Sequence, residues 1–336
     1  MKKSLLALAV LGAFAGAASA QSSVTVFGLV DQSINRIDNG GETVTQVKSN
    51  QLASNRLGFR GTEDLGGGLN AGFWIEAGMD NQNGGGASNG ALAFNRRSTV
   101  SLSGAFGEIR IGHDYTPQFW APVVGDVNGA NGLGNGLNIV DTNLGSNAAT
   151  FVRANNQVEY FLPGGLGGLY GEVGISAGQN EAGNKHWSGR LGYGAGPIDV
   201  SVDYGATKTQ TSDDYKVFGM AGSYNFGMAA LYGFYNQNKW GGAKQNSYEL
   251  SVGVPIGAGQ FRASYGHQTT SGSIRDGSSR MYGLEYVYNL SKMTSLYTSY
   301  GRISNTGLSG YVVEGNGHSA VGDVSSGYNA GIKVSF

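Results

Sequence analysis

Tight turns at a regular spacing constrain the fold of this chain more than any other feature of its sequence. The last four intervals between these turns are 30, 31, 32 and 33 residues, and each accommodates two strands of about ten residues, a short turn and one longer loop. Seven such turns join eight hairpins, so we predict sixteen antiparallel strands with both termini at the short-turn end. The turns fall near Gly67, Ala105, Gly165, Ala195, Phe226, Ala258 and Ser291.

Apolar and polar residues alternate along the segments between these turns. In the segment PIDVSVDYG, Ile198, Val200 and Val202 share one face, while Asp199 and Asp203 share the other. The segments SYELSVGVPI, QFRASYGHQ and MYGLEYVYNL alternate in the same way. This two-residue period predicts strands with one apolar and one polar face.

The composition favours a barrel in a membrane over a secreted all-β protein. Charged residues are only 13%, against roughly a quarter in ordinary soluble domains. The 59 glycines and 18 tyrosines accompany a dispersed apolar signal, and no segment after residue 20 approaches the roughly 18 apolar residues of a spanning helix. Tyrosines near strand ends suit the two membrane interfaces, although cross-strand packing is an alternative explanation. We therefore predict an all-β, transmembrane β-barrel of the outer-membrane kind.

The N-terminus has the three parts of a secretory signal peptide. Lys2 and Lys3 are followed by an apolar run from Leu5 to Phe14 and by the small-residue sequence Ala18-Ser19-Ala20. The apolar run is too short for a transmembrane anchor. We expect residues 1–20 to be removed, which leaves residues 21–336 as the barrel.

One long segment, from about residue 115 to residue 150, has neither the strand nor the helix period. It is rich in Gly and Asn and carries only two charges, Asp126 and Asp141. A structureless segment of this length inside a compact domain is usually functional. The interval that contains it, from Ala105 to Gly165, is about twice the others. We interpret it as the third external loop, folded into the barrel so that it narrows a water-filled pore.

The last strand, SSGYNAGIKVSF, keeps its alternation to the terminal residue Phe336. A closed barrel in lipid has no free edge, because unpaired backbone groups cannot be satisfied there. We therefore expect this strand to pair with the first one, SVTVFGLVDQS.

Several segments resemble one known family, the trimeric general porins of β-proteobacterial outer membranes. Among them are SNRLGFRGTEDLGGGLNAGFWIE, FNRRSTVSLSGAFGEIRIGHDYTP, RANNQVEYFLPGGLGG and the terminal GIKVSF, spread over the chain in the family's order. The chain departs from the family at His113-Asp114, where Arg-Gln is usual, and at Lys333-Val334, where Arg-His is frequent. The long loop also lacks a Pro-Glu-Phe-Gly element that some members have.

The resemblance implies a homotrimeric porin of the outer membrane that passes small hydrophilic solutes and ions without a cofactor. It also implies that the subunit interface involves the termini and early strands, and that Phe336 acts as an assembly signal. Outer-membrane lipid and lipopolysaccharide are further expected partners.

Strand parity places a set of charged residues on the inward faces near the long loop. Together with the two loop acids they are our candidates for the pore constriction, and basic residues facing such a loop select ions by charge. Because arginine keeps its charge and suits carboxylates and phosphates, we expect mild anion selectivity. The candidates are Arg56, Arg60, Glu76, Arg97, Glu108, Arg110, Asp114, Asp126, Asp141, Arg153 and Glu159, while the parity of Arg96 is ambiguous.

Other functions have weaker support in the sequence. The segment Gly174 to Gly178 matches a G-x-S-x-G nucleophile motif but lies within a strand that no helix follows. The four histidines have no metal-ligand spacing, so we expect neither catalysis nor a metal site. Without Lys2 and Lys3 there are 20 basic and 23 acidic residues, a net charge of −3 that does not suggest nucleic acid as a partner. An outer-membrane barrel enzyme and an adhesive or structural surface barrel remain the alternatives.

Overall fold

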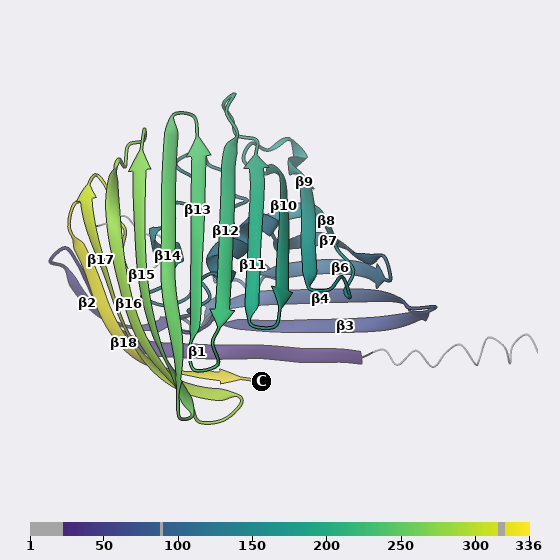
Figure 1. Cartoon of the computed structure of the whole chain (residues 1–336), viewed down its shortest axis with the longest axis horizontal. Helices are drawn as coiled ribbons and strands as arrows, with labels where there is room; N and C mark the ends of the chain where they lie inside the picture. The colour runs from purple at the N-terminus through teal and green to yellow at the C-terminus, as the bar shows by residue number, and fades with distance from the viewer. Residues whose placement is uncertain (1–22, 88–89, 315–319) are drawn as a thin grey trace, which may run out of the picture.

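The chain forms a closed antiparallel β-barrel (Figure 1), as predicted. The computed structural model describes residues 23–87, 90–314 and 320–336. The signal-peptide prediction for residues 1–20 falls outside these residues. Within the described chain, no helix has the length and apolar character needed to cross a bilayer.

Sixteen strand positions make up the wall of the barrel. Each strand pairs with its neighbours in the antiparallel sense. The strands are β1 (Ser23–Asn39), β3 (Arg56–Gly66), β4 (Leu69–Asp80), β6 (Arg97–Gly104), β7 (Gly107–Tyr115), β8 (Arg153–Phe161), β9 (Leu169–Ala177), β10 (Lys185–Ala195), β11 (Ile198–Thr207), β12 (Tyr215–Asn225), β13 (Ala230–Trp240), β14 (Ala243–Ile256), β15 (Gly259–Ser271), β16 (Gly277–Asn289), β17 (Thr294–Gly307) and β18 (Val324–Ser335).

Two further short strands do not add positions to the ring. Strand β2 (Thr43–Ser49) pairs with the second half of β1, and β3 pairs with the first half, so β2 and β3 are two parts of one wall strand. Strand β5 (Gly85–Gly86) pairs only with the end of β4. The predicted count of sixteen strands is therefore confirmed.

The last strand closes the barrel on the first. Strand β18 pairs with β1 from Leu29↔Ser335 to Asn39↔Ser325. Beyond this ladder, the backbones of Gly28 and Phe336 exchange two hydrogen bonds of 3.0 Å. The expected pairing of the terminal strand is confirmed, and the start of β1 and the end of β18 lie at the end of the barrel that carries the short turns (Figure 1).

The two faces of the wall differ as the alternation predicted. On β11, Val200 is 46% exposed on the outer face, whereas Asp203 on the inner face is 1% exposed. The same contrast recurs on β14, between Leu250 and Glu249. An exposed apolar exterior fits a lipid environment, because apolar side chains that face lipid are already removed from water.

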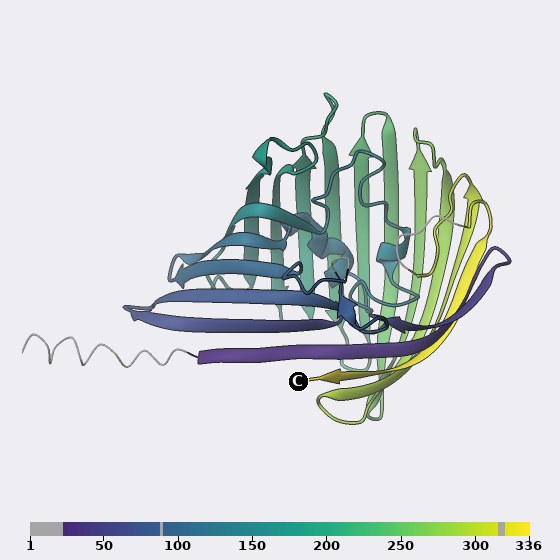
Figure 2. The ribbon, with the colours of Figure 1, turned by 180° about the vertical axis from the view of Figure 1, so that it is seen from behind.

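The segment between β7 and β8, residues 116–152, packs against the inner face of the wall. It contains three helical turns, η1 (Pro117–Phe119), α2 (Trp120–Val124) and η2 (Gly136–Ile139), which Figure 2 shows in the interior. A fourth turn, η3 (Gly178–Asn180), lies in the β9–β10 loop.

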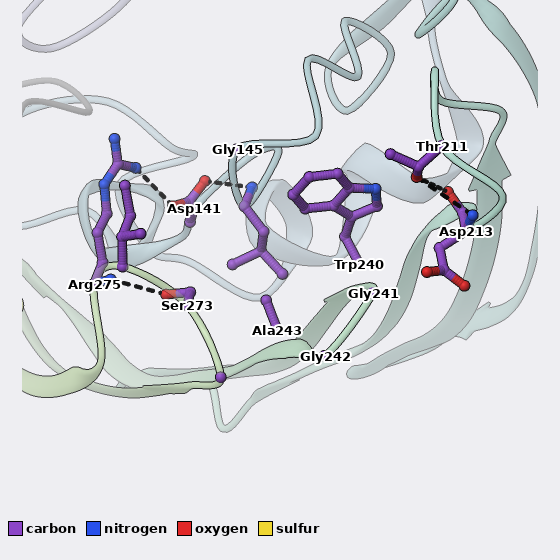
Figure 3. A pocket seen from close by; sticks show the side chains of 13 residues that line it. Asp141, Gly145, Thr211, Asp213, Trp240, Gly241, Gly242, Ala243, Ser273 and Arg275 are labelled. Carbon is purple, nitrogen blue, oxygen red and sulfur yellow. Dashed lines mark hydrogen bonds and ion pairs between the residues drawn. The ribbon is translucent and has the colours of Figure 1, made fainter.

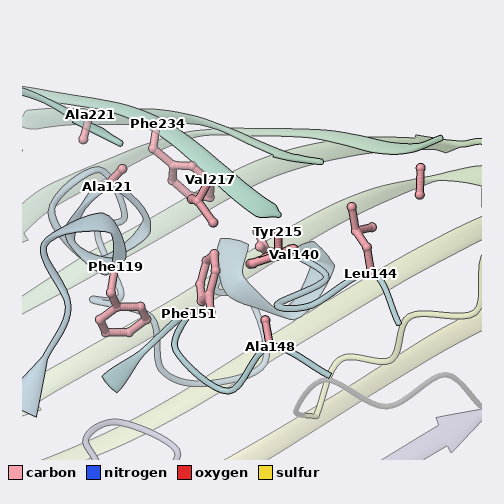
Figure 4. Close-up of a cluster of buried hydrophobic side chains, with 11 residues drawn as sticks. Phe119, Ala121, Val140, Leu144, Ala148, Phe151, Tyr215, Val217, Ala221 and Phe234 are labelled. Carbon is pink, nitrogen blue, oxygen red and sulfur yellow. The ribbon is translucent and has the colours of Figure 1, made fainter. Parts of the chain in front are cut away.

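An apolar cluster holds the first and last parts of this segment on the wall (Figure 4). Phe119, Leu144 and Phe151 of the segment lie with Val217 and Phe234 of β12 and β13. Burying a side chain such as Phe or Leu stabilises by roughly 1.5–3 kcal/mol relative to exposure. The inner faces of β12 and β13 thus carry apolar side chains where the segment packs on them.

The middle of the segment is held by polar contacts and by close backbone approach. The Ser264 hydroxyl donates to the Gly134 carbonyl at 2.5 Å, and the Val127 amide donates to the Ser251 hydroxyl at 3.1 Å. A Cβ on Gly134 would lie 2.5 Å from the Cα of Gly283, so both positions need glycine for this approach.

Candidate functional site

Six arginines gather on the inner face of strands β3 to β8. The alternation of each strand turns its polar positions inward, and the ladder register then places them side by side: Glu76 is opposite Arg97, and Arg110 is opposite Glu159. We call this set the arginine cluster. Its members are Arg56, Arg60, Arg96, Arg97, Arg110 and Arg153.

Glu76 is the acidic partner of one half of the cluster. Its carboxylate lies 2.6 Å from Nε of Arg96 and 3.5 Å from Nη1 of Arg56, and it accepts a hydrogen bond of 3.2 Å from the Trp74 indole. The side chain is only 5% exposed. A buried carboxylate with two guanidinium partners and an indole donor is fully occupied, so it fixes Arg56 and Arg96 rather than binding a solute.

Asp114 is the acidic partner of the other half of the arginine cluster. It lies 3.2 Å from Nε of Arg97 and 2.9 Å from Nη1 of Arg110, and it is 3% exposed. Arg110 also pairs with Glu108 at 3.1 Å. The acid that replaces an uncharged residue of the family pattern therefore joins two neighbouring arginines.

Aromatic rings hold the remaining guanidinium groups. Arg60 lies 5.0 Å from the ring centre of Trp74 and 5.3 Å from that of Phe27, and Arg153 lies 3.9 Å from that of Tyr115. Among the described residues, Arg60 has no carboxylate partner within salt-bridge distance. Stacking of this kind fixes a guanidinium without neutralising its charge.

Glu159 faces inward but is buried beneath the inward segment. Its side chain faces inward but is 2% exposed, close to η1: Pro117 and Glu159 both lie within 3.4 Å of the point where a Cβ on Gly174 would stand. It therefore lies behind the inward segment and is covered from the lumen.

Among the described residues, the hydrogen bonds and ion pairs of the two loop acids go to groups outside the arginine cluster. The Asp126 carboxylate accepts the Asn128 and Ala130 amides at 2.7 and 3.1 Å and is hydrogen-bonded to Glu249 of β14. Burial raises the pKa of Asp126 from 3.8 to about 6, and the hydrogen bonds from Asn128 and with Glu249 act in the opposite direction. Asp126 therefore fastens its own loop and points at the wall.

Asp141 lies farther along the same wall. It is 6% exposed, accepts the Leu144 amide at 2.8 Å and pairs with Arg275 of the β15–β16 loop at 2.9 Å (Figure 3). Asp141, Leu144 and Arg275 line a cavity of about 550 Å³ together with Trp240. Because the segment has no regular period, sequence position does not determine the direction of its side chains.

The part of the inward segment that stays half-exposed is uncharged. Its longest continuous half-exposed stretch is residues 127–132, with the sequence VNGANG. Ser54 connects it to the cluster, because its hydroxyl donates to Asn131 Oδ1 at 3.0 Å and its carbonyl accepts from Nε of Arg56 at 2.9 Å. Positive groups on the wall thus lie beside a neutral loop surface.

The charge of the site is positive overall. Six arginines stand against the four carboxyl groups of Glu76, Glu108, Asp114 and Glu159, so positive charges exceed negative ones by two. Beside the cluster, a cavity of about 410 Å³ is lined by Arg60, Trp74, Arg97, Glu108 and Arg110 together with threonines and serines of β1, β3 and β6. An anion in this space would meet guanidinium donors on several sides.

Sequence reasoning missed Arg96, Trp74 and Tyr115 as members of this site. Arg96 precedes β6, outside the alternating segment, and its Nη2 donates to the Tyr115 hydroxyl at 3.0 Å. Trp74 could have been found, since it lies two residues from Glu76 and so shares its face. Among the described residues, no group of three or more acids and histidines is arranged to hold a metal ion.

Comparisons with known proteins agree on one family. The chain matches the Gram-negative porin family over residues 7–308. It is 35% identical to outer membrane porin protein 32 of Delftia acidovorans over the whole of both chains, and 29% identical to an outer membrane porin protein of Bordetella pertussis over 90% of this chain and 94% of that one.

Solved structures show the same fold. An anion-selective porin from Comamonas acidovorans superimposes with a TM-score of 0.86 at 32% identity, covering 94% of this chain and 100% of that one. A Salmonella typhi OmpF in complex with daunomycin has a TM-score of 0.70 at 14% identity, over 93% of this chain and 97% of that one, which is a likeness of fold alone.

Proposed function

This chain belongs to the family of Gram-negative porins, and we propose that the arginine cluster forms the charged wall of its pore constriction. As a porin it is an integral protein of the outer membrane and a passive, water-filled channel for small hydrophilic solutes and ions. The finer proposal rests on one observation: six arginines gather on one part of the inner wall, next to the neutral loop surface of residues 127–132.

The pore is mildly anion-selective in this proposal. The excess of two positive charges in the cluster supports it, as do the bonds of Asp126 and Asp141 to groups outside the arginine cluster. The Comamonas acidovorans porin at 32% identity is described as anion-selective. Because ion pairs compensate much of the positive charge, the preference is small rather than absolute.

The proposal extends to processing and assembly. Residues 1–20 act as a signal peptide, residues 21–336 form the barrel, and the segment of about 115–150 is the constriction loop. Three copies assemble through the termini and early strands, within the lipid and lipopolysaccharide of the outer membrane. A band on unheated gels that runs as a trimer and collapses on heating would support the assembly, whereas a monomer in mild detergent would contradict it.

The chain acts as a channel and not as an enzyme in this proposal. The G-x-S-x-G segment lies on β9, and its Ser176 hydroxyl donates to the Asn155 carbonyl at 2.5 Å. Among the described residues, Ser188 and His186 form a hydrogen-bonded Ser–His pair at 2.8 Å, and the second ring nitrogen of His186 bonds Thr207 instead of a carboxylate. A hydrolase triad needs an acid in that place.

A planar-bilayer recording of the purified protein tests the function. The proposal predicts stepwise, ohmic conductance that rises in groups of three. An adhesive barrel with a plugged lumen, or a barrel enzyme, would give no conductance, and that result would contradict the proposal.

A further inference from the structure

Five lysines form a band around one part of the outer face of the barrel, at the end opposite the short turns. Lys216 is paired across the ladder with Lys239, and Lys239 with Lys244. The backbone amide of Lys208 donates to the carbonyl of Lys185 at 2.9 Å, so these two are neighbours as well. We call Lys185, Lys208, Lys216, Lys239 and Lys244 the lysine band.

All five side chains share the outward parity of their strands. Lys216 is opposite Ala206, which is opposite Trp187, and Trp187 is 53% exposed on the lipid-facing surface. Only Lys208 has an acidic partner in the described part of the chain, Asp214 at 2.9 Å, and its side chain remains 63% exposed. A row of like charges without partners is costly unless something outside the chain neutralises it.

An apolar groove begins directly below two of these lysines. A cavity of about 390 Å³ is bounded by Lys185, Lys208 and Asp214 and floored by Val158, Ile175, Trp187 and Ala206. A second cavity of about 470 Å³ continues on the same strands β8 to β11, where Gly171 and Gly189 leave the outer face without side chains.

The dimensions of the groove suit a hydrocarbon chain. From Lys185 to Leu191 the strand rises by about 20 Å, which is comparable to one half of a hydrocarbon core of about 30 Å. A polar head at Lys185 would therefore lie at the membrane surface while an attached chain ran toward the bilayer centre. Trp187 and Tyr204, whose rings lie 5.5 Å apart, stand beside it at the depth typical of interfacial aromatics.

We propose that the lysine band and this groove bind a phosphorylated, acylated lipid of the outer leaflet, with the phosphate on Lys185 and Lys208 and one acyl chain over Gly189 and Gly171. The inference rests on the proposed orientation, in which the longer loops are external. Strands β8 to β11 lie far around the ring from β1 and β18, so this face stays open to lipid in the proposed trimer.

Lipid binding by the full-length protein tests the proposal. The protein is reconstituted in phosphatidylcholine vesicles with a minor fraction of lipid A, and the lipid retained after detergent extraction is measured by native mass spectrometry. Each lysine near an anionic lipid surface contributes about fivefold to binding. Lys185→Gln with Lys208→Gln should therefore retain lipid A at least several-fold less well, whereas Lys292→Gln with Lys333→Gln, the same charge change at the short-turn end, should retain it like the parent.

A second variant tests the groove separately from the charge. A Cβ at Gly189 would lie 3.4 Å from Val173, an ordinary contact, so Gly189→Leu should fold, fill the groove and weaken lipid A retention with both lysines intact. Equal retention by parent, lysine and glycine variants would overturn the proposal, as would equal retention of lipid A and its dephosphorylated form.

Oligomer stability and conductance distinguish a lipid site from a contact between copies and from the proposed channel function. If the lysine variant disrupts the heat-sensitive oligomer while lipid retention is unchanged, the face is a contact between copies and the lipid assignment is wrong. Conductance should be the same in the parent, the Lys185/Lys208 variant and Gly189→Leu, since the lysine band and the groove face away from the lumen. A parent that binds lipid A without conducting would contradict the proposed function and leave the lipid site standing.

Discussion

The guanidinium of Arg60 lies 5.0 Å from the centre of the Trp74 ring, held by an aromatic surface instead of an acid. The other wall arginines near it, Arg97 and Arg110, both share Asp114. Arg60 is also the most exposed arginine of the cluster. Its charge is therefore the one least compensated by the protein and most open to a passing ion.

Replacing this residue should weaken the anion preference of the pore more than replacing a paired arginine. A unit charge acts with about 1 kcal/mol at 4 Å in water, so we expect Arg60→Gln to lower the chloride-to-potassium permeability ratio by up to about fivefold. Arg302→Gln removes the same charge from the outer face of β17 and should leave the ratio unchanged. Equal ratios in the parent and Arg60→Gln would show that Arg60 does not face the ion path.

Truncating an apolar anchor of the inward segment should loosen it. Phe151 is 2% exposed and packs against Phe119 in the cluster between the segment and β12–β14. Large-to-small changes of this kind cost roughly 3–5 kcal/mol. Phe151→Ala should therefore show more frequent current fluctuations in single-channel recordings, with the barrel itself still folded. A quiet channel with parental conductance would mean that the cluster does not hold the loop.

The packing of the loop should depend on pH through Asp126. Its pKa is raised from 3.8 to about 6 in the packed loop, so the packed form binds the proton more tightly than a released loop would. Packing is then most stable below pH 3.8 and weakens as the pH rises through 6. Current fluctuations should thus be more frequent at pH 7 than at pH 4. Asp126→Asn combined with Glu249→Gln, which leaves neither carboxyl of this contact able to ionise, should remove this difference. An unchanged pH dependence in the double variant would exclude the pair as its source.

The terminal residue should matter for assembly and not for conduction. Phe336 completes the ladder with Gly28, and its ring occupies the space beside that glycine, since a Cβ there would lie 2.5 Å from the ring. Phe336→Ser should reduce the amount of folded protein in the outer membrane several-fold. Phe226→Ser, at an exposed aromatic of a short turn, is the matched control. Parental levels of Phe336→Ser would remove the proposed role.

The wall of the barrel could be predicted from sequence because its side chains repeat every two residues. That period fixes which side chains share a face, and the turn spacing fixes how many strands there are. It placed Glu76, Arg97 and Arg110 on one face correctly. The interruption at residues 50–55, which divides one wall strand into β2 and β3, has no such signature.

The candidate site could be predicted only in part, because the two-residue period fails in the segments around it. The β7–β8 ladder shifts register between Gly112 and Asp114, and Asn156 has a positive φ of 52°. Arg153 nevertheless reaches the cluster, since its Nε donates to the Arg96 carbonyl at 2.7 Å. Asp126 and Asp141, on a segment without any period, face the wall through contacts that only the folded chain reveals.

The zero-current potential across a KCl gradient tests the central claim most directly, namely that the arginine cluster sets the ion preference. The account predicts a potential of the sign that reports chloride preference in the parent, decreasing toward 1 M salt as the Debye length falls to about 3 Å. Arg110→Ala combined with Arg153→Ala should move the potential toward cation preference. A cation-selective parent, or a double variant with the parental potential, would contradict the account.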